Sequence, residues 1–514
     1  MKIKLENDKI MSKIKKDKRK QEKTMKMAIL IVFSIISIIF TVYMLMSRFF
    51  PLKYAVILIV AIVLLNFTIY ALLLTKKKKW KTILSAILMV ISLIIFVLGA
   101  FALKDINRAI SKVSSSQEVD IYSIIVMKNN PYKMAIEVEQ EDIALVDSDK
   151  QSIIQELLPN NRDYITNAYS SYPELVEALY EGTEQFILFD EAFREIIYNV
   201  YANFDVETRV LVSTNPNIIE ELKNAKIRSP LEYYDIIKKD KADKPEKGDY
   251  TEYESTKVEN AEPFTMLISG IDTYGHINTK SRSDVNIVLA INPQKHEILM
   301  VPVVRDAYVT IAGTGFKDKL THAGVLGVET TKNSVANALG MPIDVYVKVN
   351  FTTLVELVDT LGGVTVDNPI SFSGAGHHFP AGKIRLNGAE ALAFSRERKS
   401  LAAGDFDRGM NQTRVIKGII NEVIQPKSIT KFSTILEQLS DSFITDLSDQ
   451  AIRSIVQNQL NTGGSWTVNS TSITAQGQMG LPSYMMPGYS LYFAVLNEDS
   501  IIDVREKLLQ VINE

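Results

Sequence analysis

Basic and acidic residues gather in a few short segments of the sequence, each beside an apolar run that predicts a β-strand. In chain order the segments are GIDT and SRSD (270–273 and 281–284), VVRD (303–306), DKLTHA (318–323), and FSRER and GDFDR (394–398 and 404–408). Charged side chains at strand ends point into a loop-lined crevice rather than the core, which is where open α/β sheets hold ligands. Guanidiniums match phosphate oxygens, and carboxylates suit a divalent cation. The combination predicts an anion-and-metal site.

Two arginines in the fourth segment are spaced for a shared ligand. Side chains alternate along a strand, so Arg396 and Arg398 share one face if this segment is a strand, and Glu397 faces away. Arg282 and Asp284 have the same spacing. Two guanidiniums side by side repel each other unless an anion joins them, so a pyrophosphate is the natural occupant.

Simpler interpretations compete with this one. A single neighbouring pair such as Arg305 and Asp306 is commonly a structural ion pair, so the case for a site depends on several such segments together. His377 and His378 lie in a Gly-rich loop and are interpreted as solvated side chains rather than ligands. The sequence has no cysteine, which excludes disulfides, thiolate ligands and cysteine nucleophiles.

The elements that must position these residues predict an α/β fold. Apolar runs that predict strands lie at 264–271, 285–291, 298–304 and 345–349, with helical patterns at 330–339 and 352–361. They predict a large α/β domain with a central mixed sheet over residues 263–514. Residues 104–245 predict a smaller α/β accessory domain, with strands at 122–127 and 186–189 and helices at 174–180 and 191–201. The stretch 238–262 is highly charged and almost without apolar residues, and 246–262 is assigned as the linker.

Three stretches near the N-terminus are free of charge and have about the 20 residues that a helix needs to cross hydrocarbon. They are residues 27–47, 54–75 and 82–103, and each is interpreted as a transmembrane helix. Lys and Arg near short loops stay in the cytoplasm. The tail of residues 1–26 has 11 of them, and the loop between the second and third spans has five. The prediction is a multi-pass cell-membrane protein with a cytoplasmic N-terminus and everything after about Lys104 outside the cell.

Charge is distributed unevenly along the chain. Residues 1 to 103 carry 18 Lys and Arg against 4 Asp and Glu, and the totals of 57 and 60 then leave 39 basic and 56 acidic residues after them. The part predicted to be extracellular therefore has a net charge of −17. Nucleic-acid binding relies on basic residues that neutralise phosphates, so no nucleic-acid partner is expected.

At this point the sequence resembles one family. The signature segments of the LytR-CpsA-Psr catalytic domain are similar, in order, to GIDT, SRSD, VVRD, DKLTHA, VNFTTLVELVDTLGGVTVDNP, LNGAEALAFSRERK and GDFDRGMNQTRVIKGII, which span Phe264 to Ile420. The three spans and the accessory domain resemble the CpsA branch, and GGSWTVNS and SYMMPGYSLYF resemble its C-terminal segment, which completes the domain. The resemblance implies a membrane-anchored phosphotransferase that moves a glycopolymer, such as capsular polysaccharide or teichoic acid, from a polyprenyl-pyrophosphate carrier to peptidoglycan.

The resemblance also implies roles for individual residues. Asp272 and Asp284 match the carboxylates that hold Mg²⁺, with Mn²⁺ as another possible ion. The matching pyrophosphate ligands are Arg282, Arg305, Lys319, Arg396, Arg398 and Gln412, with Arg408 supporting them. The segment after Arg408 reads Gly409-Met410-Asn411, which departs from the family pattern and removes one basic contact. Catalysis is assigned to Arg305, Arg396, Arg398 and Asp306, and Asp306 is placed to take the proton of the attacking hydroxyl.

Two other functions fit the same predicted site. A phosphatase would use water in place of a sugar hydroxyl, and a regulator of envelope synthesis would bind the lipid-linked glycan without turning it over. Direct gene control is not expected, because the N-terminal tail lacks the apolar periodicity of a DNA-binding helix bundle. The expected partners are the lipid-linked glycan, peptidoglycan, the membrane, and proteins of capsule or wall biosynthesis.

Overall fold

The computed structural model describes residues 2–74, 79–138, 142–158, 164–215, 237–238, 244–254, 258, 261–271, 277–425, 435 and 442–513. The chain forms two compact units, Met1–Ser111 with Ile452–Gly463, and Lys112–Ala451 with Gly464–Glu514. The N-terminal helices belong to the first unit as far as Ser111, and the second unit contains most of both predicted α/β domains. Residues 104–111 and 452–463, which the sequence analysis assigned to those domains, belong to the first unit.

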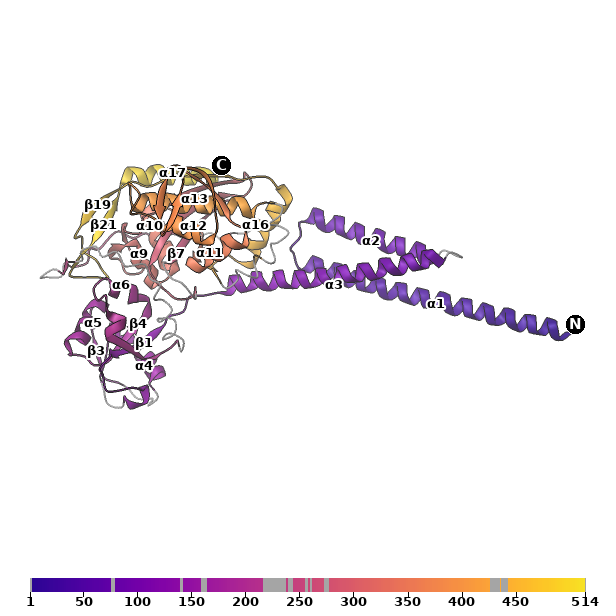
Figure 1. The fold of residues 1–514 in the computed structure, drawn as a ribbon, viewed down its shortest axis with the longest axis horizontal. Coiled ribbons are helices and arrows are strands. Elements are labelled where there is room, and N and C mark those ends of the chain that lie inside the picture. The colour runs from indigo at the N-terminus through magenta and orange to yellow at the C-terminus, as the bar shows by residue number, and fades with distance from the viewer. Residues whose placement is uncertain are drawn as a thin grey trace. The chain divides into compact units, whose positions relative to one another are not determined.

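The first unit contains three long apolar helices (Figure 1). They are α1 (Lys2–Met46), α2 (Leu52–Leu74) and α3 (Lys79–Ser115). Each is long and apolar enough to cross a membrane, which confirms the three predicted apolar helices. They pack together through Phe33, Ile69 and Phe96. Helix α16 (Asp449–Thr462) contributes Arg453 to this unit, and Nη1 of that side chain donates to the Ser47 carbonyl and to Asn107 Oδ1, each at 2.8 Å.

A six-stranded mixed sheet forms the centre of the large domain in the second unit. Its strands are β7 (Phe264–Ile271), β8 (Ser283–Asn292), β9 (Glu297–Pro302), β12 (Val345–Val349), β17 (Ile444–Thr445) and β18 (Thr467–Ser470). The order is β17-β12-β7-β8-β9-β18, with antiparallel pairs in the middle and parallel pairs of β12 with β7 and of β18 with β9. The predicted α/β fold with a mixed sheet is confirmed, and β18 belongs to the C-terminal segment predicted to complete it.

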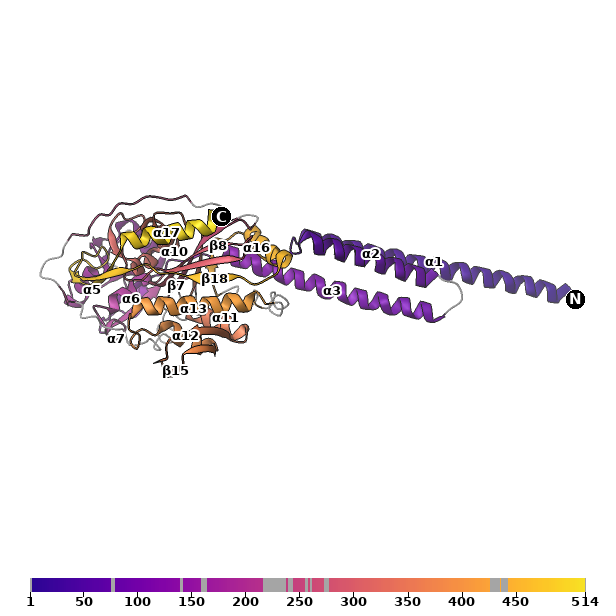
Figure 2. The ribbon, with the colours of Figure 1, turned by 90° about the horizontal axis from the view of Figure 1, so that it is seen from above.

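Helices cover both faces of this sheet (Figure 2). On one side lie α10 (Val328–Leu339) and α17 (Glu498–Asn513), whose residues Val335, Leu339 and Leu508 are fully buried in the core. Burying each such side chain contributes about 1.5–3 kcal/mol. On the other side lies α13 (Asp405–Val423), which packs against α12 (Gly388–Arg396), and α12 packs against α11 (Phe351–Thr360). Both predicted helices of this domain are confirmed within two residues.

Short elements complete the domain. The hairpins are β10 (Tyr308–Thr310) with β11 (Lys317–Lys319), β13 (Val364–Asn368) with β16 (Gly382–Leu386), β14 (Phe372–Gly374) with β15 (His377–Phe379), and β19 (Ala475–Met479) with β21 (Tyr492–Leu496). Helices α9 (Leu320–Ala323) and η4 (Gly324–Leu326) follow β11, and β20 (Tyr489–Ser490) pairs with β6 (Ile237–Lys238). His377 and His378 therefore lie in a strand, which corrects the predicted loop.

Part of the stretch assigned as linker lies along the surface of this domain. The Lys317 amide donates to the Glu246 carbonyl at 2.7 Å, and the Thr251 amide donates to Asn337 Oδ1 at 2.7 Å. Tyr253 packs against the hydrophobic core of the domain. The described residues of this stretch are thus held by the domain, although they have too few apolar side chains to form a core of their own.

The accessory module, defined as residues 122–213, folds around a five-stranded sheet of order β3-β2-β4-β1-β5. The strands are β1 (Tyr122–Met127), β2 (Ile143–Leu145), β3 (Thr166–Ala168), β4 (Ile187–Asp190) and β5 (Thr208–Ser213). The helices are η1 (Ala135–Glu137), η2 (Ser148–Lys150), α4 (Gln151–Leu157), α5 (Tyr172–Glu181), η3 (Glu191–Phe193), α6 (Arg194–Tyr198) and α7 (Phe204–Glu207). Both predicted strands and the helix at 174–180 are confirmed, whereas the predicted helix at 191–201 is broken into η3 and α6. One core cluster joins Ile125 and Phe193 of this module to Met486 and Phe493 of the large domain.

Candidate functional site

A cavity of about 560 Å³ opens beside the central sheet, where the predicted segments meet. Nine of the ten predicted site residues line it, and they are Arg282, Asp284, Arg305, Asp306, Lys319, Arg396, Arg398, Arg408 and Gln412. The tenth, Asp272, lies outside the described residues. Segments more than a hundred residues apart in the sequence are therefore gathered in one place.

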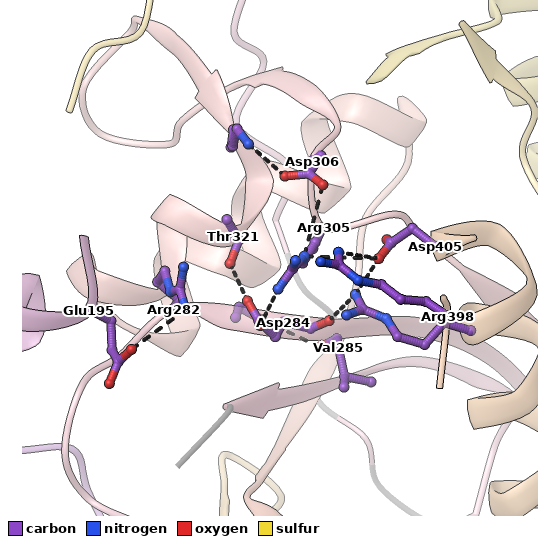
Figure 3. Close-up of polar contacts among 12 residues, drawn as sticks. Glu195, Arg282, Asp284, Val285, Arg305, Asp306, Thr321, Arg398 and Asp405 are labelled. Atoms are coloured by element: carbon purple, nitrogen blue, oxygen red, sulfur yellow. Dashed lines mark hydrogen bonds and ion pairs between the residues drawn. The ribbon is translucent and has the colours of Figure 1, made fainter. Parts of the chain in front are cut away.

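Strand pairing explains why the first two segments meet. Strands β8 and β9 are antiparallel, and Ile287 pairs with Pro302, so the start of β8 lies beside the end of β9. Asp284 is at the start of β8, and Arg305 is three residues after the end of β9. Nη1 of Arg305 consequently donates to Oδ2 of Asp284 at 2.5 Å (Figure 3).

A close backbone approach brings the third segment to the same edge of the sheet. Gly324 follows α9, and a Cβ atom there would lie 2.4 Å from the Ser281 carbonyl oxygen and 2.5 Å from the Ser283 amide nitrogen. Only glycine leaves room for this contact. It allows Thr321 in α9 to reach the start of β8, where its hydroxyl donates to Oδ1 of Asp284 at 2.7 Å.

Asp284 lies at the centre of the charged cluster. It is buried, and besides Arg305 and Thr321 it has Arg408, whose Nη2 donates to the Asp284 carbonyl at 3.3 Å. Burial alone would raise the pKa of Asp284, but the guanidiniums of Arg305, Arg282 and Arg408 outweigh burial and lower that pKa well below its usual range. The carboxylate therefore stays ionised at any physiological pH.

Asp306 and Lys319 form a second pair in the cavity. Nζ of Lys319 donates to Oδ1 of Asp306 at 2.8 Å, and both side chains are buried. Nε of Arg305 lies 3.9 Å from the other carboxylate oxygen. Burial opposes ionisation of Asp306, yet Lys319 and Arg305 lower its pKa. Asp306 thus holds two cations toward the cavity, and a lowered pKa makes it a weak base.

Asp405 is a member of the cluster that the sequence did not single out (Figure 3). It opens α13, and its Oδ1 lies 2.8 Å from Nη2 of Arg408 and 3.9 Å from both Arg305 Nε and Arg398 Nη1. Burial lowers the pKa of Arg398, and the neighbouring Arg408 lowers it further, against the effect of Asp405. One carboxylate therefore compensates three guanidiniums. The i, i+3 spacing of Asp405 and Arg408 is the signal that identifies it.

The structure corrects the predicted strand in the FSRER segment. Arg396 is the last residue of helix α12, and Arg398 comes two residues after the helix. Both still line the cavity, because the chain leaves the helix at this point. Arg396 lies over the ring of Phe351, 4.3 Å from its centroid, and Gln412 Nε2 donates to the Ser395 carbonyl at 3.4 Å.

Gly409, in the segment after Arg408, lies close to the central sheet. A Cβ atom at Gly409 would lie 3.1 Å from Cβ of Pro302 at the end of β9. Glycine here allows α13 to lie close to the sheet, which brings Arg408 to Asp284.

The cavity has a polar side and an apolar side. The polar side has seven Lys and Arg against three Asp and Glu among the lining residues, although the chain as a whole has a net charge of −3. The apolar side is formed by helices α11 and α12 and includes Phe351, Val355, Ala389, Leu392 and Ala393. Such a cavity suits a ligand with an anionic part and an apolar part.

The described residues contain no group of three or more His, Asp or Glu side chains arranged to hold a metal ion. Oδ1 of Asp405 is buried, and within the described part of the chain it accepts no hydrogen bond of good geometry even though Arg408 is close. An acceptor oxygen in this state has a lone pair available for a cation. Mg²⁺ commonly takes only one or two carboxylates and completes its shell with phosphate and water, so a site for it does not require a group of three acidic side chains.

A buried Asp–His pair adjoins the same cavity and was quoted in the sequence motif without a role. Nδ1 of His322, which lines the cavity, lies 2.9 Å from Oδ1 of Asp318. Asp318 also accepts from Ser483 Oγ at 2.9 Å and from the Met485 amide at 2.7 Å. Burial opposes ionisation of Asp318, but His322 and the hydrogen bonds from the Met485 and Lys319 amides lower its pKa. The carboxylate therefore orients the imidazole ring.

Known proteins match the part of the chain that carries this cavity. A model of the LytR_cpsA_psr family matches residues 231–504. The polyisoprenyl-teichoic acid–peptidoglycan teichoic acid transferase TagU of Enterococcus faecalis is 35% identical over 259 residues, 50% of this chain and 82% of that protein. The TagU protein of Bacillus subtilis is 39% identical over 207 residues, 40% of this chain and 66% of that protein. The crystal structure of B. subtilis TagU aligns with a TM-score of 0.40 and 32% identity, covering 49% of this chain and 98% of that one.

Proposed function

Because this chain belongs to the LytR-CpsA-Psr family, we propose that it transfers a phosphate-linked glycopolymer from a polyprenyl-pyrophosphate carrier to peptidoglycan. The observation that carries this proposal is the cavity, where seven cationic side chains stand beside an apolar wall. A diphosphate between a lipid and a sugar has the charge and the apolar part that such a cavity binds. The TagU proteins are named as teichoic acid transferases, so teichoic acid is the first polymer to test, followed by capsular polysaccharide.

The polar and apolar sides of the cavity bind different parts of the substrate. Arg305, Arg398 and Arg408 surround the space beside Asp284 and Asp405, where the diphosphate binds. Arg282, Lys319, Arg396 and Gln412 complete the set of predicted ligands. The first isoprene units lie along the apolar wall of α11 and α12. In this proposal the phosphorus atoms lie at the cationic end of the cavity.

The reaction is a displacement at phosphorus. A sugar hydroxyl of peptidoglycan attacks the phosphorus that bears the glycan, and the bond from that phosphorus to the bridging oxygen breaks. Polyprenyl phosphate leaves with the electron pair, and the hydroxyl proton passes to a base. Guanidiniums fixed in place before the reaction stabilise the charge that grows on the leaving phosphate, which is worth about 10²–10³ in rate for one such donor.

Two residues, Asp306 and His322, are candidates for the proton acceptor. Asp306 stays the predicted base, but Lys319 engages it and lowers its pKa. His322 lines the same cavity and is held by Asp318. The variants Asp306→Asn and His322→Gln distinguish the two residues. The variant that removes the base has a lower kcat, whereas Asp306→Asn has a higher KM if Asp306 only anchors Lys319.

A divalent ion, Mg²⁺ or Mn²⁺, is part of the proposal. Asp284 and Asp405 would hold it, together with Asp272, which lies outside the described residues. When bound, such an ion neutralises phosphate charge and polarises the phosphorus–oxygen bonds. The buried, incompletely bonded Oδ1 of Asp405 supports this assignment.

The membrane arrangement is proposed from charge. Three apolar helices anchor the chain, and the basic residues among residues 2–26 of α1 and around the connection from α2 to α3 favour a cytoplasmic N-terminus. Three crossings then put the cavity outside the cell. The anchor keeps the enzyme in the bilayer that carries its lipid substrate.

Reconstitution tests the function directly. The full-length chain in liposomes, given a polyprenyl-pyrophosphate glycan radiolabelled in the sugar, is expected to transfer label to peptidoglycan fragments. Release of labelled glycan at an equal rate without fragments identifies a phosphatase, and binding without any turnover identifies a regulator. Arg305→Ala is expected to lose transfer, whereas Arg385→Ala, an exposed arginine of the same domain outside the cavity, keeps it.

A further inference from the structure

Helix α6 of the accessory module reaches the catalytic cavity. Asn199, which directly follows α6, is one of the residues that line the cavity. Oε2 of Glu195 lies 3.6 Å from Nη2 of Arg282, one of the predicted pyrophosphate ligands (Figure 3). Glu195 and Asn199 are four residues apart and therefore lie on one face of the helix. Asn199 brings the end of this face to the cavity, and Glu195 contacts it through Arg282.

The rest of α6 is fixed by packing. Ile196 and Ile197 are fully buried in the core of the accessory module. Arg194 is also buried, and its Nη2 donates to Glu191 Oε1 at 2.8 Å. The same hydrophobic cluster includes Met486 of the cavity wall, so α6 and that wall share one core. A side chain carried by this helix is held in place relative to the cavity.

Arg282 depends on this helix for its orientation. Its side chain is only 12% exposed, and its Nε is buried with no hydrogen-bond partner within the described part of the chain. The 3.6 Å separation from Glu195 is an ion pair and is too long for a hydrogen bond. Glu195 therefore orients the guanidinium electrostatically and leaves its donors to a ligand.

We propose that the accessory module completes the substrate site through this face of α6. Glu195 is a positioning residue that holds Arg282 for the diphosphate. Asn199 places a neutral amide, which both donates and accepts hydrogen bonds, where it meets the sugar next to the diphosphate. The inference rests on the proposed function for the identity of the ligand. It assigns the accessory module a role in substrate recognition that no motif in its sequence predicts.

The test uses the full-length chain in detergent or liposomes, with Glu195→Gln as the main variant. Its KM for the lipid-linked substrate is expected to rise about threefold to tenfold with kcat nearly unchanged, because Arg282 binds the phosphate in both the ground and the transition state. The Kd for inorganic pyrophosphate, measured by calorimetry, is expected to rise by a similar factor. Glu195→Asp should recover part of the loss. Glu181→Gln, an exposed acidic residue of the same module, is the matched control and should match the wild type.

A double-mutant cycle separates positioning from a general effect on the fold. In an Arg282→Gln background, Glu195→Gln should cause no further loss if it acts through Arg282. Equal KM and Kd values in Glu195→Gln and wild type, tighter binding in that variant, or full additivity in the cycle would each overturn the proposal. If Glu195→Gln does not fold, Glu195→Asp carries the same cycle. Weaker pyrophosphate binding in a chain that transfers no glycan would uphold this inference and defeat the proposed function instead.

Discussion

Arg305 is the side chain whose removal tests the site most directly. Its Nη1 donates to Asp284 at 2.5 Å, and its Nε lies 3.9 Å from both Asp306 and Asp405. One guanidinium thus stands among three carboxylates and beside the space where phosphate charge develops. Arg305→Ala removes a charge that is only 14% exposed, so solvent replaces little of it.

Two effects of Arg305→Ala can be estimated. Loss of one preorganised donor to the developing charge costs about 3–4 kcal/mol of transition-state stabilisation, or about 10²–10³ in kcat. Leaving Asp284 without its closest cation costs up to about 3 kcal/mol of folding stability. This value is an upper limit, because Arg282, Arg408 and Thr321 still stabilise the carboxylate. Arg305→Lys keeps the charge without the planar fork, so we expect an intermediate loss of about tenfold.

The loss of stability has a pH signature. In the folded protein the pKa of Asp284 lies below that of an unfolded aspartate, about 3.9, so Asp284 contributes stability above about pH 4 that is lost as pH falls through the folded pKa. Arg305→Ala raises the folded pKa toward the unfolded value. The difference in stability between variant and wild type should therefore be full at neutral pH and shrink below about pH 4.

The assay is transfer of radiolabelled glycan by the full-length chain, with thermal unfolding measured on the same samples. Arg385→Ala serves as the control for activity, because Arg385 is an exposed arginine outside the cavity, paired with Glu422. Arg385 also donates to the Gly362 and Gly363 carbonyls, so the unfolding temperature of this variant is measured as well. A folded Arg305→Ala protein that keeps more than about a tenth of wild-type kcat would refute the placement of Arg305 at the reacting phosphate.

Three further predictions follow from single contacts. Asp405→Asn should raise the Mg²⁺ concentration for half-maximal activity about tenfold, as measured by titration of the ion in the transfer assay, and an unchanged midpoint would remove Asp405 from the metal site. Burial raises the pKa of Asp190 to about 7, so ionising this side chain costs the folded state up to about 4 kcal/mol. The stability of the wild type should therefore fall between pH 4 and pH 7. The unfolding temperature of Asp190→Asn should stay level across this range. Gly324→Ala should destabilise the domain by about 1–3 kcal/mol and lower activity, because its Cβ would press on the backbone of Ser281 and Ser283; a normal unfolding temperature would contradict the close approach.

The sequence predicted four of the six strands of the central sheet and most of the residues that line the cavity. The strands predicted at 264–271 and 285–291 are β7 and β8, and charged residues beside them line one cavity. This succeeded because a strand buried on both faces has a near-continuous apolar run, and a charge at the end of such a run needs a charged partner when it is buried, as Asp284 is. The position of a charge relative to a strand end is a local property that a sequence records.

Local signals also explain two failures. The FSRER segment was read with period two, but the helix that contains Arg396 begins with a capping box, in which Asn387 Oδ1 accepts from the Glu390 amide and Glu390 Oε2 accepts from the Asn387 amide, each at 2.9 Å. The sequence does not distinguish Asp405 from Asp407, two acids in the first turn of α13, and no role was predicted for either. Asp407 instead accepts from the Ala403 amide at 2.8 Å, outside the arginine cluster.

The contribution of the accessory module could not be predicted in the same way. Glu195 and Arg282 are far apart in the sequence, and nothing in the residues around α6 distinguishes an acid that faces a cavity from one that faces solvent. The pairing follows from packing between two cores, through Phe193 on one side and Met486 on the other. Such contacts depend on tertiary structure, which a single sequence does not encode in any local pattern.

The arrangement of partners explains why a site for an anion contains so many acids. A buried guanidinium without compensation costs several kcal/mol, so a cluster of bare arginines would prevent folding before the substrate arrives. Three of the cations have different partners: Lys319 pairs with Asp306, Arg408 pairs with Asp405, and Arg396 lies over the ring of Phe351. The diphosphate then meets cations that are already in place, so little side-chain entropy is lost on binding. The carboxylates are therefore the reason that the arginines can be preorganised, and a variant that neutralises one of them should weaken the binding of an anion even though it makes the cavity more positive.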